Sequence, residues 1–186
     1  MPSITDALKD ALSSVATAAG DVVGTVRDVA KNTVVQTVRS GGEVVTTAEE
    51  VASKVVSEGV QAVSNAGVSL TNGVTGLVSG AIQGVSQVGG DVGSTATAAA
   101  RGAVKNVSQI GGDVGQAAVS AVAGSVKAVE EIGGDTGGVA KNAVIGALQA
   151  ADEIGSEAGG IVRKALLNAA ALPHDIIDAL LTGKKA

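Results

Sequence analysis

Apolar and polar residues recur along this chain with the period of an α-helix, most clearly over residues 100–132. On a helix with 11 residues per three turns, the apolar residues of this segment share one sector and the polar residues share the other. The apolar sector contains Ala100, Val104, Val107, Ile110, Val114, Ala118, Ala121, Val122, Val126, Val129 and Ile132. The opposite sector contains Lys105, Asn106, Gln109, Asp113, Gln116, Ser120, Lys127 and Glu131. The pattern predicts an amphipathic helix with a wide, shallow apolar face. A β-solenoid is the alternative, because Val and Thr also suit strands.

The same pattern returns along the chain with a 22-residue period. Similar segments begin at Gly80, Gly102, Gly124 and Gly146. This period is two elevens, so the apolar stripe keeps its direction from one copy to the next. We therefore predict an all-α fold of long amphipathic helices or helical hairpins. One repeat region is expected over residues 1–168, with weaker copies in 1–66 and stronger copies in 67–168, and a short C-terminal helix or cap over 169–186.

The weaker copies contain one irregular interval. From Gly41 to Gly67 the chain has a 26-residue spacing in place of the 22-residue spacing seen elsewhere. The four additional residues amount to about one turn of an α-helix. The spacing predicts that one extra helical turn is inserted between these copies.

The recurring Ile-Gly-Gly-Asp unit has two interpretations. In the first, Gly ends one helix in the left-handed conformation and Asp caps the next, which gives helices of about 18 residues. In the second, the helix continues and Gly marks the place where another helix crosses closely. We favour the second interpretation, because the 22-residue spacing preserves the helical phase of the stripe, which a hairpin does not require.

The apolar sector also carries glycines four residues apart, a spacing that lets two helix backbones approach closely. The sequence therefore nominates a helix–helix contact surface or a lipid-facing surface. Its candidate residues are Gly89, Gly93, Val104, Val107, Ile110, Gly111, Gly115, Val126, Val129, Ile132, Gly133, Gly137, Gly155 and Gly159.

Composition narrows the possible partners. The chain has no aromatic residue and no Cys, and 45% of its 186 residues are hydrophobic, mainly Ala and Val. Its net charge of −5 argues against nucleic acid, whose binding rests on Lys and Arg. The longest charge-free run, between Glu58 and Asp91, is long enough to span a bilayer but is rich in Ser, Thr, Asn, Gln and Gly. Because the N-terminus lacks an apolar signal segment, we expect a cytoplasmic protein. This expectation includes association with a membrane or granule surface.

Catalytic and metal-binding signatures are weak. His174 is the only histidine, and no Cys accompanies it as a metal ligand or catalytic partner. Asp91, Asp113 and Asp135 recur at the 22-residue period without the oxygen-rich loop that calcium requires. We expect no enzyme activity, no cofactor and no small-molecule substrate.

In its 11-residue period and its Val/Ala-built apolar face, the chain loosely resembles the repeat helices of perilipins, apolipoproteins, synucleins and late-embryogenesis-abundant proteins. The resemblance covers most of residues 4–167 and is one of period, not of motif. Paired glycines and sparse charge depart from those families. No functional residue is carried over from them.

Two functional hypotheses follow from this pattern. The first is a structural protein that forms homo-oligomers through its Ala/Gly/Val face, as a bundle, sheath or filament. The second is an amphipathic-helix coat, or a glycine-zipper protein, on a membrane or hydrophobic granule. The absence of Trp and Phe counts against the second, since interfacial helices commonly use them.

Overall fold

The computed structural model describes residues 4–15, 20–41 and 47–182, and within these ranges it contains helices and turns but no strands. The helices are α1 (Ile4–Val15), α2 (Val22–Arg39), α3 (Ala48–Asn65), α4 (Leu70–Gln87), α5 (Val92–Gln109), α6 (Val114–Ile132), α7 (Thr136–Ile154), α8 (Ser156–Asn168) and α9 (His174–Thr182). The prediction of an all-α fold is confirmed.

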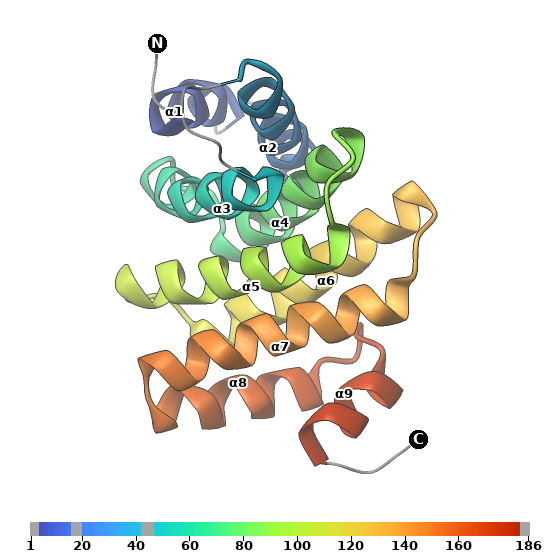
Figure 1. Cartoon of the computed structure of the whole chain (residues 1–186). Coiled ribbons are helices and arrows are strands. Elements are labelled where there is room, and N and C mark those ends of the chain that lie inside the picture. Colours follow the sequence, from blue (N-terminus) through green and yellow to red (C-terminus); the bar gives the residue numbers. More distant parts are fainter. Residues whose placement is uncertain (1–3, 16–19, 42–46, 183–186) are drawn as a thin grey trace.

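The helices stack in two layers (Figure 1). One layer contains α2, α4, α6 and α8, and the other contains α1, α3, α5, α7 and α9. Each helix packs against the next but one in its own layer and against its sequence neighbours in the other layer. Since the backbone of every described helix packs only against helices close to it in sequence, the architecture is that of a helical-repeat protein.

The Gly-Gly-Asp units are turns between helices, so the continuous-helix interpretation favoured by the sequence is wrong. Helices α3 to α7 begin at positions 48, 70, 92, 114 and 136, which are evenly spaced along the chain. The turn glycines have positive φ, for example +72° at Gly111. Gly112 N–H donates to Val107 O at 2.9 Å, the hydrogen bond that closes a helix with a left-handed glycine.

The aspartate after each turn caps the following helix. The Asp113 carboxylate accepts a hydrogen bond from Gln116 N–H at 3.0 Å, and Asp91 accepts one from Ser94 N–H at 2.7 Å. Such a cap satisfies one of the N–H groups that the first helical turn leaves without a partner. Glycine and aspartate together reverse the chain within a few residues.

The irregular interval between Gly41 and Gly67 does not lengthen a helix. Helices α2 and α3 each have 18 residues, as α4 and α5 do. The predicted extra helical turn is therefore absent from both helices. Residues 42–46, which fall within the irregular interval, lie outside the described residues.

Small residues allow helices of one layer to approach until backbone meets backbone. A Cβ atom at Gly124 of α6 would lie 2.5 Å from the carbonyl oxygen of Thr75 in α4. Gly146 of α7 is packed in the same way against the carbonyl oxygen of Thr97 in α5, and Gly80 of α4 against that of Arg27 in α2. Only glycine fits at this separation, which explains why it is retained inside helices despite its cost of about 1 kcal/mol relative to Ala.

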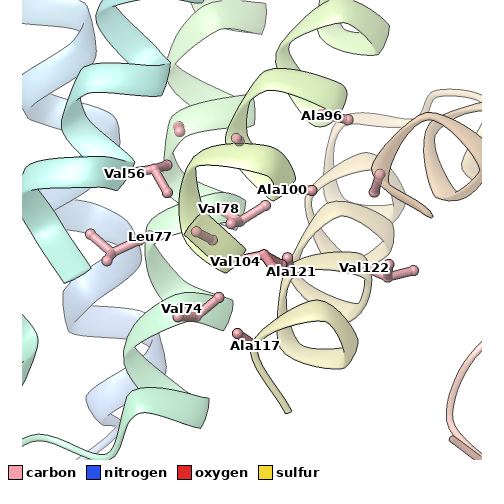
Figure 2. Packing of buried hydrophobic residues seen from close by; sticks show 14 of the residues in the cluster. Val56, Val74, Leu77, Val78, Ala96, Ala100, Val104, Ala117, Ala121 and Val122 are labelled. Atoms are coloured by element: carbon pink, nitrogen blue, oxygen red, sulfur yellow. The ribbon is translucent and has the colours of Figure 1, made fainter. Parts of the chain in front are cut away.

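The core lies between the layers and consists largely of Val and Ala. Buried side chains from Leu8 to Ile177 form one continuous hydrophobic cluster. Figure 2 shows Val78 of α4, Val104 of α5 and Ala121 of α6 close to one another within it. Such short side chains fill only a thin interior, and they suit the short distances between the backbones.

The stack ends differently from its middle. Gly155 both ends α7 and precedes α8, which has 13 residues where α7 has 19. Pro173 precedes α9, which lies within the predicted C-terminal segment 169–186. Among the helices of the described residues, none has the length and hydropathy needed to cross a membrane, and the charge-free run near α4 is no exception.

We predict that Gly124→Ala destabilises the protein by about 1–2 kcal/mol, because its methyl group pushes α6 away from the Thr75 carbonyl. Gly160→Ala is the matched control, since nothing lies within 4 Å of its Cβ position in α8. It should stabilise by about 0.5–1 kcal/mol through helix propensity alone. Urea unfolding measures both values. A stabilising Gly124→Ala would contradict the close approach.

A second substitution tests the turns. Gly111→Ala should destabilise by about 1–2 kcal/mol, because a left-handed conformation strains any residue with a Cβ atom. Gly111→Asn should lower the free energy of unfolding by less than Gly111→Ala, since Asn tolerates the left-handed conformation. In a continuous helix, the same Ala substitution would instead stabilise. Urea unfolding measures the change in the free energy of unfolding, and the sign of that change for Gly111→Ala distinguishes a turn from a continuous helix.

Candidate interaction surfaces

The residues nominated as a contact or lipid face occupy three kinds of position. Val104, Val107, Gly115 and Val129 are buried in contacts between helices of the same chain. Ile110 and Val126 are partly buried, and Ile132 is exposed. Gly89, Gly111, Gly133 and Gly155 lie in the turns, and no atom lies within 4 Å of their Cβ positions.

The second glycine of each four-residue pair faces another helix of the chain or its own helix. A Cβ atom at Gly93 would lie 2.7 Å from Asn142 Nδ2 of α7, and one at Gly115 would lie 3.0 Å from Ala165 Cβ of α8. At Gly137 the nearest atom belongs to Ile176 of α9, 3.3 Å away. At Gly159 it belongs to Arg163, within α8 itself. The glycines thus divide into turn positions and packing positions.

Sequence reasoning missed the glycines at which backbones approach most closely. These are Gly80, Gly124 and Gly146, which were not among the nominated contact residues, although the spacing of Gly76, Gly80 and Gly84 also indicates a close approach. Their signal was present, since they recur with the 22-residue period in the middle of predicted helices. The sequence does not indicate which carbonyl group of another helix lies opposite each of these glycines.

Charged residues join helices of one layer across the solvent-facing surface. Glu131 of α6 accepts hydrogen bonds from Arg27 Nη1 of α2 at 3.1 Å and from Gln83 Nε2 of α4 at 2.6 Å. Glu153 of α7, which occupies the equivalent position of the next repeat, pairs with Arg101 and Lys105 of α5. These carboxylates hold neighbouring helices in register.

The ion pairs shift the pKa values of their members. Burial lowers the pKa of Arg27, but the hydrogen bond from Arg27 to Asp28 and the charges of Asp28 and Glu131 outweigh it and raise that pKa above its ordinary value. Desolvation raises the pKa of Glu153, but the hydrogen bonds and positive charges of Arg101 and Lys105 together outweigh it and lower that pKa below its ordinary value. Each shift favours the charged form that the pair needs.

Two hollows flank α9. A cavity of about 490 Å³ is lined by Val126, Glu130, Thr136, Gly137, Ala171, Leu172, Pro173, Asp175 and Ile176. Its lining comes from the C-terminal half of α6, the start of α7, and the segment that leads into α9. A neighbouring hollow of about 380 Å³ is lined by Lys141, Asp175, Ile176, Ala179 and Leu180. A third cavity, of about 240 Å³, lies between α3 and α5.

Neither hollow beside α9 brings together a recognisable catalytic set. His174 is exposed at the start of α9. Across residues 4–15, 20–41 and 47–182, no group of three or more His, Cys, Asp or Glu side chains is placed to hold a metal ion.

Comparison with known proteins supports the fold and nothing finer. No protein-family model matches the chain, and no curated protein matches it. Among solved structures, the crystal structure of a de novo designed helical repeat protein, DHR7, is similar, with a TM-score of 0.53 and 14% sequence identity. The match covers 96% of this chain and 95% of that chain. At this identity the likeness shows a helical-repeat fold alone.

The Glu49 carboxylate connects α3 to the turn before α5, and it predicts a pH dependence. Asp91 N–H donates to Glu49 Oε1 at 2.9 Å, and this bond lowers the pKa of Glu49 below 4.5. Because the pKa is lowered in the folded state, the carboxylate stabilises the fold above pH 4.5, and that contribution disappears as the pH falls through the folded pKa.

Glu49→Gln should therefore lower the free energy of unfolding near pH 7, and its difference from the unsubstituted protein should vanish in acid. Urea unfolding between about pH 7 and pH 3 measures the difference, over the range in which a carboxylate titrates. Glu130→Gln, an exposed carboxylate on α6, is the control and should show no such convergence. A Glu49→Gln difference that is independent of pH would contradict the assignment.

Proposed function

We propose that the protein is a non-enzymatic structural protein whose stacked helices form a rigid scaffold. The observation that carries this proposal is where the Ala/Gly/Val face lies in the folded chain. That face is used within the chain, where it forms one hydrophobic cluster running from α1 to α9. A chain that buries its apolar surface between its own stacked helices is suited to holding partner-binding surfaces at a fixed distance.

The ends of the stack support a particle of finite length. Helix α2, the first of its layer, exposes a polar stripe at Thr25, Asp28, Asn32, Gln36 and Arg39. Helix α8, the last of that layer, exposes Ser156, Glu157, Gly160, Ile161, Arg163, Lys164 and Asn168. Terminal helices with largely polar outer faces cap a repeat stack, because they need no further neighbour. End-to-end growth into a filament would bury these polar side chains.

Association of copies is a second proposal, and exposed isoleucines favour it. Ile132, Ile154 and Ile161 are 39%, 38% and 45% exposed, while most other large apolar side chains of the described residues are buried. Three side chains cover much less than the roughly 1,200–2,000 Å² of a stable interface. We therefore propose weak lateral association through these residues rather than a tight homo-oligomer built on the glycine positions.

A lipid or granule coat remains the alternative proposal, and it carries a clear structural requirement. Val104, Val107 and Val129 lie inside the stack, so the helices would have to separate before these residues could enter a lipid interface. A stack that opens exchanges contacts with its own helices for contacts with lipid. That exchange is measurable as a change in tertiary structure on vesicle binding.

One experiment separates the scaffold from the lipid coat. We expect far-UV circular dichroism of the lipid-free protein to show high helicity, and light scattering to give a monomer that associates only at high concentration. Neutral and anionic vesicles should leave both the spectrum and a urea unfolding curve unchanged. A chain that is largely unfolded in buffer and helical only with vesicles would overturn the scaffold proposal in favour of the coat.

A further inference from the structure

One interface of the stack is looser than its equivalents. Here, equivalent positions are those related by the 22-residue period in successive helices. A Cβ atom at Gly102 of α5 would lie 3.7 Å from the carbonyl oxygen of Ser53 in α3. The same distance is 2.5 Å between Gly124 and Thr75, and it is shorter still between Gly146 and Thr97. Helices α3 and α5 therefore stand farther apart at this level than α4 and α6 or α5 and α7.

The residue whose carbonyl group faces the glycine also differs between these interfaces. At Gly124 and Gly146 this residue is Thr75 or Thr97, and at Gly80, where the approach is equally close, it is Arg27. Thr97 Oγ1 donates to Asn142 O of α7 at 3.1 Å, and Thr75 Oγ1 lies 3.4 Å from Ser120 O of α6. The equivalent residue in α3 is Ser53, which lacks the methyl group of threonine.

Two further differences make the gap polar. Asn106 of α5 stands where the equivalent residues of α6 and α7 are the buried Ala128 and Ala150. Ser57 of α3 is partly exposed at the gap, whereas its equivalent in α4, Ser79, is completely buried. The closed and open forms of the same interface thus coexist in one molecule.

The result is a cavity of about 240 Å³ with polar and cationic walls. Its lining residues are Ser53, Ser57, Ala98, Arg101, Gly102, Lys105 and Asn106. Two serines, an asparagine, an arginine and a lysine contribute to this lining, and none of these described lining residues is a carboxylate. The Asn106 amide donates to Gly102 O at 2.8 Å within α5, and the head groups of Arg101 and Lys105 pair with Glu153 of α7. Hydroxyl groups beside two positive charges are chemistry that suits an oxyanion.

We propose that this pocket binds a phosphate group, as inorganic phosphate or as a small phosphomonoester. Arg101 supplies the planar donor fork that matches phosphate oxygens, and Lys105 supplies a second positive charge. The hydroxyl groups of Ser53 and Ser57 donate from the opposite wall. The cavity is smaller than the roughly 300–1,000 Å³ of sites for drug-sized ligands, so it admits the anion but not a large organic body.

The Glu153 carboxylate competes with a bound phosphate for the two cations of this pocket. Its carboxylate pairs with both Arg101 and Lys105 from α7, on the far side of α5 from α3. The pairing holds the two cations in place and also neutralises part of their charge. A dianionic phosphate competes with this single carboxylate for the remaining donors, so removal of the Glu153 charge strengthens binding.

The test is isothermal titration of the full chain with inorganic phosphate and with glycerol phosphate, at constant ionic strength. We expect one saturable site for both ligands. Arg101→Gln should weaken the affinity at least about tenfold, the loss of roughly one charge-assisted pair. Glu153→Gln should strengthen it. Ser53→Thr should abolish binding, because it places in α3 the residue that stands at the closed interfaces of α4 and α5.

We expect the Ser53→Thr variant to fold, since Thr occupies the equivalent position in two other helices of the chain. A loss of binding in this variant would therefore not result from unfolding. Its urea unfolding should match or exceed that of the unsubstituted protein. Lys164→Gln on α8 is the matched control for loss of one exposed positive charge and should leave the affinity unchanged. The proposal is overturned if neither ligand saturates, if Ser53→Thr binds normally, or if Lys164→Gln weakens binding as much as Arg101→Gln.

Discussion

Helices of the same layer approach one another until a glycine of one helix lies against a main-chain carbonyl group of the next. At Gly124 and Thr75 the space for a Cβ atom is already occupied by the carbonyl oxygen. This contact fixes how far apart α4 and α6 stand, and its equivalents at Gly80 and Gly146 do the same on either side. The spacing of the helices within each layer follows from it.

Close approach dictates which side chains the core admits. Between backbones so near, Val and Ala fill the available volume, and an aromatic ring would force the layers apart. The absence of Phe, Tyr and Trp is therefore consistent with the packing distance and does not indicate a weak core. Since many small contacts replace a few large ones, the stability of the protein is spread along the stack and depends on each glycine position.

The same regularity makes departures from it informative. Between α3 and α5, where Ser53 faces Gly102, the helices stand farther apart and polar residues line a cavity. Beside α9, at the C-terminal end of the stack, a hollow is lined by both apolar and polar residues. A structural scaffold can acquire binding sites in this way, because a local change in one helix pair leaves the other pairs intact. The outer charges, such as Glu131 and Glu153, link helices without entering the core.

The sequence alone determined the helical class, the apolar stripe of residues 100–132 and the two candidate roles of each Gly-Gly-Asp unit, because helical period and capping chemistry are local properties. Turn and continuous helix have the same 22-residue spacing, so the favoured interpretation failed at Gly111, where a positive φ ends the helix. Tertiary structure alone decided which carbonyl group faces Gly124, which cations reach Glu153 and where a cavity lies beside Ser53. These depend on residues about 50 positions apart in sequence, and a periodic pattern specifies which face of a helix is apolar but not which helix lies against it.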